Sequence, residues 1–436
     1  MCWYRKERST CKEESESRMN SIPLKPDHKR FFTNPFLHDP NAISQYCTDK
    51  WLEEMIEQLS FRLMNRQMSR EECQESGPYV GSAGIGYAML KAAQSLPEKL
   101  ITNVEFCNQL LASQFKYAKD ASKSRQTRYL CGTLGLHVIK AISDHMAGRS
   151  IEGYGRIFSS LIDTVTCDGY QRIGDDDILN GRSGFLLAVQ QIKKATGYSV
   201  LSDAEIQRVL KAIIRSGRRY SRQHHSPAPL FYQWHQKEYL GAAHGLSGVL
   251  QALLSFWDLL AEDERVDVKQ TLDWLCSIQQ PDGNFPSSSG HIGYGKGEDE
   301  LVHWCHGAPG VVHLLIQALV LFSEDQYLQS AKRCVELIWY KGILRKGFGL
   351  CHGIAGTGYA MLLLYRVVND PLLLERAKAF AMIMMDQKFE QLSNVPDSPY
   401  SLFEGWAGAL CFLVDVHNPV RAQFPLLPIN FGPNSM

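Results

Sequence analysis

A Gly-x-x-Gly pair recurs along the whole chain and limits the folds that the chain can adopt. Chance alone would produce about three such pairs in 436 residues with 34 glycines, so a single copy means nothing. Spacing and context are informative, because successive copies start 46 to 64 residues apart and six of the seven are followed at once by an apolar residue. The seven copies are Gly81–Gly84, Gly132–Gly135, Gly181–Gly184, Gly245–Gly248, Gly307–Gly310, Gly353–Gly356 and Gly405–Gly408. An eighth copy, Gly290–Gly293, stands in a loop rich in Ser and Gly.

Each of the seven copies precedes a stretch that is apolar around most of a helix's circumference, such as residues 311–322. A helix of this kind is buried on several sides. Between the copies lie amphipathic segments such as residues 205–223, in which apolar residues recur every three or four positions. Alternating β-branched runs are scarce. The pattern therefore predicts seven units, each with one outer amphipathic helix and one inner apolar helix.

Seven such units can close on themselves as an all-α fold, an (α/α)7 toroid with seven outer and seven inner helices. The glycines suit this fold, because they allow inner helices to approach closely at one end and allow φ > 0 in the turns there. Helix N-termini, with unpaired N–H groups and positive dipole ends, would surround that mouth. The alternative is an open solenoid in which glycine only marks turns.

The composition excludes several classes of protein. The 46 Lys and Arg residues balance 46 Asp and Glu residues, whereas proteins that bind nucleic acid through phosphates normally carry a basic excess. The N-terminal residues lack the apolar run of a signal peptide, and residues 311–322 are too short for a spanning helix of roughly 20 residues. We expect a cytoplasmic protein without nucleic-acid partner or transmembrane segment, though one compatible with peripheral membrane association. Residues 1–28 are expected to be a disordered extension, and residues 29–436 a single domain.

The residue that precedes the first glycine is histidine in three of the last four units: His244, His306 and His352. In two of these units a cysteine comes before the histidine, namely Cys305 and Cys351. Thiolate and imidazole are ligands that Zn²⁺ prefers, and three protein ligands leave a fourth position open for catalysis. Cys305, Cys351 and His352 are the best set, although by spacing alone His306 or His244 could replace His352. Otherwise each His caps its own turn and each Cys packs in the core.

Five longer motifs connect the chain with a known family. They are F-T-N-P-F at 32–36, E-Y-L-G-A-A-H-G-L-S-G at 238–248, L-V-H-W-C-H-G-A-P-G-V at 301–311, K-G-F-G-L-C-H-G at 346–353 and P-Y-S-L-F-E-G at 399–405. With these motifs in this order, the sequence resembles the lanthionine synthetase C-like proteins over roughly residues 31–424. It is more similar to the eukaryotic members than to the bacterial cyclase. The family fold is an (α/α)7 toroid, which agrees with the repeat.

The resemblance implies roles for particular residues. The family's zinc ligands fall on Cys305, Cys351 and His352, which leaves His306 outside the set. Its histidine close to the metal falls on His244. An acidic residue four positions before the glycine of the third unit, a candidate acid or base, falls on Asp177. Asp177 ends a run of three aspartates, and acidic runs are otherwise typical of solvated loops.

The resemblance also implies a substrate. Bacterial members add a cysteine thiol across dehydroalanine or dehydrobutyrine, and eukaryotic members are similar to them but bind glutathione. We therefore expect a zinc enzyme that adds glutathione to dehydroamino acids in proteins or peptides and forms a thioether. The family's glutathione contacts fall on Lys346 and on Asn394, Pro396 and Asp397. Asn394 stands where a relative has a basic residue, and Val395 where it has threonine.

In such an enzyme the thiolate is the nucleophile, and zinc favours it by lowering the pKa of the thiol. The enolate that forms after attack on the β-carbon needs a proton, for which His244 is the first candidate donor and Asp177 the second. The alternative function is a glutathione-binding, zinc-containing signalling or scaffold protein without turnover. Carbohydrate-active toroids, which need a pair of carboxylates, and zinc prenyltransferase toroids share the architecture but lack the two C-H-G units.

Overall fold

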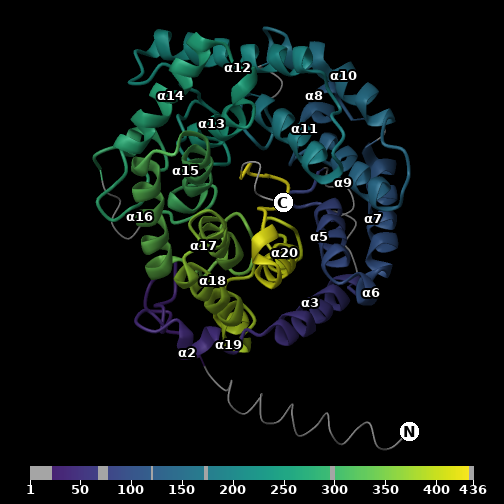
Figure 1. The fold of residues 1–436 in the computed structure, drawn as a ribbon, viewed down its shortest axis with the longest axis vertical. Coiled ribbons are helices and arrows are strands. Elements are labelled where there is room, and N and C mark those ends of the chain that lie inside the picture. Colours follow the sequence, from purple (N-terminus) through teal and green to yellow (C-terminus); the bar gives the residue numbers. More distant parts are fainter. Residues whose placement is uncertain (1–21, 67–76, 119–120, 171–174, 295–299, 432–436) are drawn as a thin grey trace, which may run out of the picture.

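The computed structural model describes residues 22–66, 77–118, 121–170, 175–294 and 300–431. Within these ranges, outer and inner helices alternate along the chain (Figure 1). The outer helices are α3 (Asp49–Met64), α7 (Thr102–Ala118), α10 (Gly153–Thr166), α12 (Asp203–His224), α14 (Glu262–Ser277), α16 (Asp325–Lys341) and α18 (Pro371–Met384). The inner helices are α5 (Ser82–Ser95), α9 (Thr133–Met146), α11 (Arg182–Thr196), α13 (Leu246–Leu254), α15 (Ala308–Phe322), α17 (Ile354–Val368) and α20 (Trp406–His417).

The inner helices form a closed ring. Each one contacts the next along the chain, and the last, α20, contacts both α5 and the outer helix α3 of the first unit. Figure 1 shows the two concentric layers, with α20 beside α3 and α5 although the chain ends are far apart in sequence. The all-α (α/α)7 toroid is therefore confirmed, and the open solenoid is excluded.

Burial follows the two types of helix that the sequence predicts. In α15 every residue from Ala308 to Ala318 is buried, as expected for a helix that is apolar all round. In α12 one face is buried, through residues that include Ile206, Val209, Leu210 and Ile213. A capping box at Ser202 starts this helix, because the Ser202 hydroxyl accepts the Glu205 N–H while the Glu205 carboxylate accepts the Ser202 N–H. Among the described residues, no helix is both long and apolar enough to cross a membrane.

The glycine pairs start the inner helices. In all seven units the first glycine is the N-cap. A Cβ on the second glycine would lie 1.8 to 2.4 Å from the carbonyl oxygen of the residue six positions earlier, so no larger residue fits. The expected close approach is thus confirmed. The expected positive φ is wrong for all pairs except that of Gly307, with φ 112°, because N-cap residues usually have extended backbone.

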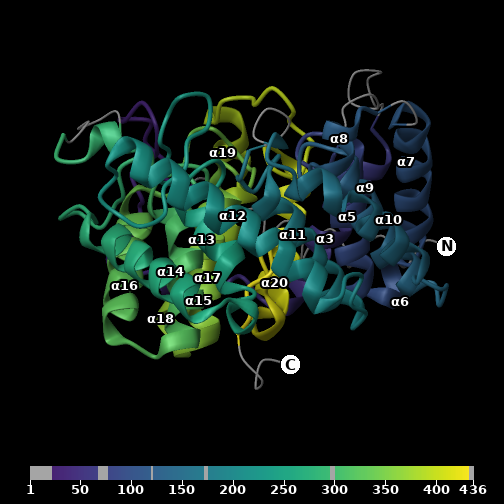
Figure 2. The same ribbon diagram turned by 90° about the horizontal axis from the view of Figure 1, so that it is seen from above.

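The C-terminal segment after α20 fills the middle of the ring. Its apolar side chains are fully buried: Phe424, Leu426, Leu427 and Ile429. The ring of Phe424 packs against Trp304 and Tyr359, with centroids 5.5 and 5.2 Å apart, and the Tyr129 hydroxyl donates to the Leu426 carbonyl at 2.7 Å. Figure 2 shows the ring edge-on, with α20 (yellow) in the middle of the view. Because Trp304 and Tyr129 stand just before the inner helices α15 and α9, this segment packs the middle of the ring up to the helix N-termini.

A segment near the N-terminus runs along the outside of the toroid. The Phe32 N–H donates to the carbonyl of Ile343, just after α16, at 2.8 Å, and the Phe32 side chain is fully buried. Ile22 and Leu24, which fall within the extension expected at residues 1–28, are buried too. The remainder of the expected extension, the first 21 residues, lies outside the described residues.

Candidate functional site

The three predicted metal ligands lie together at the mouth of the toroid. The ligand atoms of Cys305, Cys351 and His352 all lie within 4.8 Å of one another. Cys305 precedes α15, while Cys351 and His352 precede the neighbouring helix α17. The Cys305 N–H donates to the Cys351 carbonyl at 3.3 Å, which holds the two units together at this point. Two thiols and one imidazole suit zinc and leave a fourth position open, so the residues fit the expected ion.

Spacing alone left His306 and His244 as alternatives to His352, and the structure separates the three. Within the described residues, the group that could hold a metal contains His352 and neither of the others. The His306 ring faces Tyr239 instead, with centroids 5.1 Å apart. The ligand set therefore depends on which side chains the fold turns inward, and sequence spacing could not show this.

The protein surroundings of the Cys351 thiol disfavour its thiolate when no metal is bound. Burial raises the pKa of the Cys351 thiol well above its usual value, and the nearby Cys305 raises it further, while His352 lowers it. Metal binding requires deprotonated cysteine, and a bound cation supplies the positive charge that favours it. A bound cation would therefore favour the thiolate form of Cys351, as expected of a metal ligand.

Sequence reasoning missed Tyr79. Its hydroxyl bonds to Cys351, and burial together with the two metal-site cysteines raises the pKa of Tyr79 well above its usual value. The ring stacks on Phe403, with centroids 4.6 Å apart. One signal could have found this residue, because Tyr79 stands two positions before the first glycine of its unit, as Cys305 and Cys351 do in theirs.

His303 was also missed. It is buried, and its ring centroid lies 6.0 Å from that of His352. Burial, followed by the positive charges of His352 and Lys346, lowers the pKa of His303 well below its usual value. A neutral imidazole therefore lies beside the metal ligands at neutral pH. Its place two residues before Cys305, in the longer motif L-V-H-W-C-H-G at 301–307, was the signal that could have found it.

The two predicted catalytic residues contact each other directly. His244 Nδ1 lies 2.5 Å from Asp177 Oδ2, and the Asp177 side chain is only 2% exposed. The other oxygen of Asp177 accepts the N–H groups of Asn180 and Gly181, at 2.6 and 3.0 Å, at the start of α11. Asp177 is thus held in place by the backbone and can orient the imidazole. His244 is 16% exposed, so its ring is still accessible.

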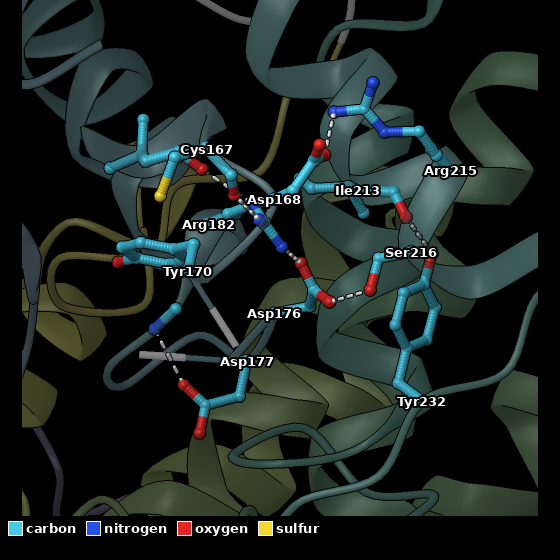
Figure 3. Close-up of polar contacts among 12 residues, drawn as sticks. Cys167, Asp168, Tyr170, Asp176, Asp177, Arg182, Ile213, Arg215, Ser216 and Tyr232 are labelled. Carbon is cyan, nitrogen blue, oxygen red and sulfur yellow. Dashed lines mark hydrogen bonds and ion pairs between the residues drawn. The ribbon is translucent and has the colours of Figure 1, made fainter. Parts of the chain in front are cut away.

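The acidic run that ends in Asp177 is not a solvated loop. Asp176 forms a buried ion pair with Arg182 at 2.7 Å and accepts the Ser216 hydroxyl at 2.6 Å (Figure 3). Asp177 points away from that pair in the same view. Burial, followed by the charges of Asp177 and Asp176, raises the pKa of Asp175 to about 6. The run therefore divides into a structural residue, Asp176, and a residue that faces the mouth, Asp177.

The His244–Asp177 pair and the metal group belong to adjacent inner helices. A Cβ on Gly241, three residues before His244, would lie 2.3 Å from the Cys305 carbonyl oxygen. The ring of Tyr239 contacts residues of both units, with its centroid 6.3 Å from that of His244 and 5.1 Å from that of His306. The candidate acid and the candidate metal centre are thus neighbours on one rim, as closure of the ring predicts.

The four residues that the resemblance assigned to glutathione lie on two adjoining segments. The Asn394 N–H donates to the carbonyl of Arg345, next to Lys346, at 2.6 Å. A Cβ on Gly347 would lie 3.3 Å from the Asn394 carbonyl oxygen and 4.0 Å from Pro396. Lys346, Asn394 and Asp397 are exposed, and Lys346 lies beyond the end of α16. The fold therefore brings these segments together, although contact with glutathione itself stays a prediction.

Residues 73–429 match the sequence profile of the family described as lanthionine synthetase C-like protein. This chain belongs to that family. Glutathione S-transferase LANCL1 of Danio rerio is 36% identical to this family member over 360 residues, which are 80% of this chain and 84% of the relative. Nisin cyclase superposes with a TM-score of 0.57 at 17% identity, covering 84% of this chain and 93% of its own. At that identity the likeness supports the toroid fold alone.

Proposed function

We propose that this lanthionine synthetase C-like protein is a zinc-dependent glutathione transferase that adds glutathione to dehydroalanine or dehydrobutyrine residues in proteins or peptides. The Cys305, Cys351 and His352 group at the mouth carries the proposal, because two thiols and one imidazole suit a zinc ion with an open position. A relative named as a glutathione S-transferase supports the choice of thiol and reaction. The choice of a dehydroamino acid as the acceptor substrate rests on the family resemblance.

The reaction forms one C–S bond. The glutathione sulfur attacks the β-carbon of the dehydroamino acid, the carbon–carbon double bond becomes single, and the α-carbon takes up a proton. A bound zinc ion would supply a Lewis acid that lowers the pKa of the thiol, whose proton leaves to solvent. Cys305, Cys351 and His352 would hold this ion. Because the thiol proton has left to solvent and the α-carbon takes up another, the site needs a proton donor at the α-carbon.

His244 is the proposed donor to the α-carbon. Asp177 bonds to Nδ1 at 2.5 Å, so the ring offers its other nitrogen, Nε2, to a reactant. The carboxylate keeps the imidazole in one orientation, as an oriented acid requires. Such a group contributes typically about 10²- to 10⁴-fold to rate.

Glutathione would lie between this rim and the segments around Lys346 and Asn394. The exposed ammonium of Lys346 suits a glutathione carboxylate as a point charge, and the Asp397 carboxylate suits the amino group. Because Asn394 is uncharged where a relative is basic, we expect this contact to be weaker here. The cytoplasmic location expected from the sequence stays a prediction.

The first test is zinc content by elemental analysis in wild type and Cys351→Ala, with thermal shift with and without glutathione. We expect about one zinc per chain in wild type, its loss in the variant, and stabilisation by glutathione only in wild type. Cys107→Ala is the matched control, because Cys107 is equally buried but lies outside the metal group. A dehydroalanine peptide then reports turnover by the mass of the thioether product.

Two results would contradict the proposal. Wild type without zinc and indifferent to thiols would mean that the Cys–His units serve turns and packing. Zinc and glutathione binding without any thioether product would favour the alternative function, a signalling or scaffold protein that binds glutathione but has no turnover.

A further inference from the structure

The loop between α12 and α13 contains a tight hairpin at residues 234–237. The Trp234 N–H donates to the Lys237 carbonyl at 2.9 Å, and the Lys237 N–H donates back at 3.1 Å. The two central residues, His235 and Gln236, both have positive φ, 47° and 61°. This is the pattern of a type I′ turn, which normally uses Asn and Gly because other side chains are strained there.

Strain of this kind persists only where the surrounding structure holds it, and it concentrates at functional sites. We therefore asked which contacts of the hairpin stabilise its strained backbone. Its first residue, Trp234, is partly buried and lies at the mouth, ten residues before His244. The side chain of Trp234 is the part of the hairpin that contacts a predicted catalytic residue.

The indole of Trp234 stacks on the imidazole of His244. The ring centroids are 3.7 Å apart and the planes differ by 14°. The edge of Trp234 is in turn enclosed by His235, at 4.1 Å, and Tyr239, at 6.1 Å. The indole is therefore held from two sides and covers one face of the imidazole.

Two independent contacts fix the orientation of His244. Asp177 holds Nδ1 at 2.5 Å, and a single contact of this kind still allows the ring to tilt about it. The stacked indole of Trp234 prevents this tilt. Together they leave Nε2 as the nitrogen that a reactant meets, in one direction. Orientation matters because a misplacement of about 1 Å costs on the order of 10²-fold in rate.

We propose that Trp234 is a positioning residue that holds the His244 imidazole ready for proton transfer, and that the strained hairpin exists to place it. The inference rests on the proposed function, in which His244 donates the proton. Trp234 acts through His244 and does not touch the reacting atoms. It should therefore affect the rate of the chemical step and leave the binding of glutathione unchanged.

The kinetic test compares Trp234→Leu, which removes the aromatic face, with Trp234→Phe, which retains one. With glutathione and a dehydroalanine peptide, we expect Trp234→Leu to lower kcat by about 10- to 100-fold, with KM for glutathione within about twofold of wild type. Trp234→Phe should recover most of kcat. If Trp234→Leu does not fold, Trp234→Gln, which also removes the aromatic face, replaces it.

A spectroscopic test reports the stacking without turnover. The ring current of the indole should shift the His244 Cε1 proton upfield in NMR spectra, and the loss of this signal in His244→Asn assigns it. Trp234→Leu should move the signal downfield, and Trp234→Phe should keep part of the shift. Trp257→Leu is the matched control, because Trp257 is also partly buried and contacts an aromatic ring, Phe322, at 4.9 Å, away from His244.

The outcomes separate the two proposals. Wild type without turnover overturns the proposed function and the positioning role that rests on it. An active wild type in which Trp234→Leu loses the upfield shift but keeps its kcat overturns the positioning role alone. A rise in KM with unchanged kcat also overturns it, because that result would indicate a direct substrate contact.

Discussion

At the scale of single residues, the burial of a histidine side chain determines its protonation state in the folded protein. His313 lies in the middle of α15, is completely buried, and packs against Phe424 with ring centroids 4.7 Å apart. Within the described residues, neither of its ring nitrogens has a hydrogen-bond partner. Burial therefore lowers the pKa of His313 to about 3, and for the same reason that of His137 falls to about 4. The folded protein contains both imidazoles in the neutral form.

These two histidines predict a loss of stability in mild acid. Below pH 6.5 both histidines bind protons in the unfolded chain. In the folded chain they stay neutral until the pH reaches about 4 for His137 and about 3 for His313. The free energy of unfolding therefore falls as the pH is lowered through this range. Each contributes about 1.4 kcal/mol per pH unit in that window. Urea unfolding at pH 7 and pH 5 measures this. His313→Leu, which removes the unpaired group, should reduce the difference by about 2 kcal/mol, and an unchanged difference would contradict the assignment.

At the scale of the element, the start of each inner helix has the same structure in all seven units. The second glycine of each pair lets the helix pass against the carbonyl of the residue six positions earlier. That residue lies in the segment that brings the cysteines and histidines to the mouth, as Trp304 does immediately before Cys305. Helix packing and ligand placement thus share the same few residues.

Gly310→Ala tests this coupling. Its Cβ would lie 1.9 Å from the Trp304 carbonyl oxygen and 2.7 Å from the Ala242 Cβ. We expect a loss of about 3 kcal/mol or more in the free energy of unfolding, by urea denaturation, together with lower zinc content because Cys305 must move. Gly290→Ala is the matched control from the eighth pair, where an added Cβ meets nothing within 4 Å. Equal stability of the two variants would show that the close approach is not required.

For the whole molecule, closure of the ring is the decisive event, and a buried polar network marks the closure. Asp415, in the last inner helix, accepts from Lys91 of the first inner helix at 2.8 Å. It also accepts the Tyr359 hydroxyl at 2.7 Å and the Gln423 N–H at 3.2 Å. The first unit, the last two units and the C-terminal segment therefore meet at one carboxylate.

Asp415→Asn should destabilise the protein by about 3–5 kcal/mol in urea denaturation, because it leaves the Lys91 ammonium buried without its counter-charge. Asparagine retains an oxygen for Tyr359 and Gln423, so the change isolates the charge. Lys91→Met/Asp415→Asn should lose less than the two single variants predict together, by about 2 kcal/mol. Strictly additive losses would mean that the pair does not interact in the folded protein.

Local patterns in the chain predict the seven-unit repeat with its inner and outer helices, because hydrophobic periodicity reports spacing within one unit directly. Spacing alone left the open solenoid possible and left His306 and His244 as alternatives to His352. The family resemblance implied the closed toroid and the set Cys305, Cys351 and His352. His244 and Asp177 were separate candidates for the acid, and their direct contact is known only from the structure.

Other features depend on contacts between distant units, which no local pattern contains. Tyr79 reaches Cys351 only because the last inner helix closes on the first, and Asp176 and Asp177 differ in role only because the backbone turns one toward Arg182 and the other toward His244. The stack of Trp234 on His244 likewise depends on a turn with two strained residues that sequence preferences would reject. Burial and long-range packing override local propensity at these positions.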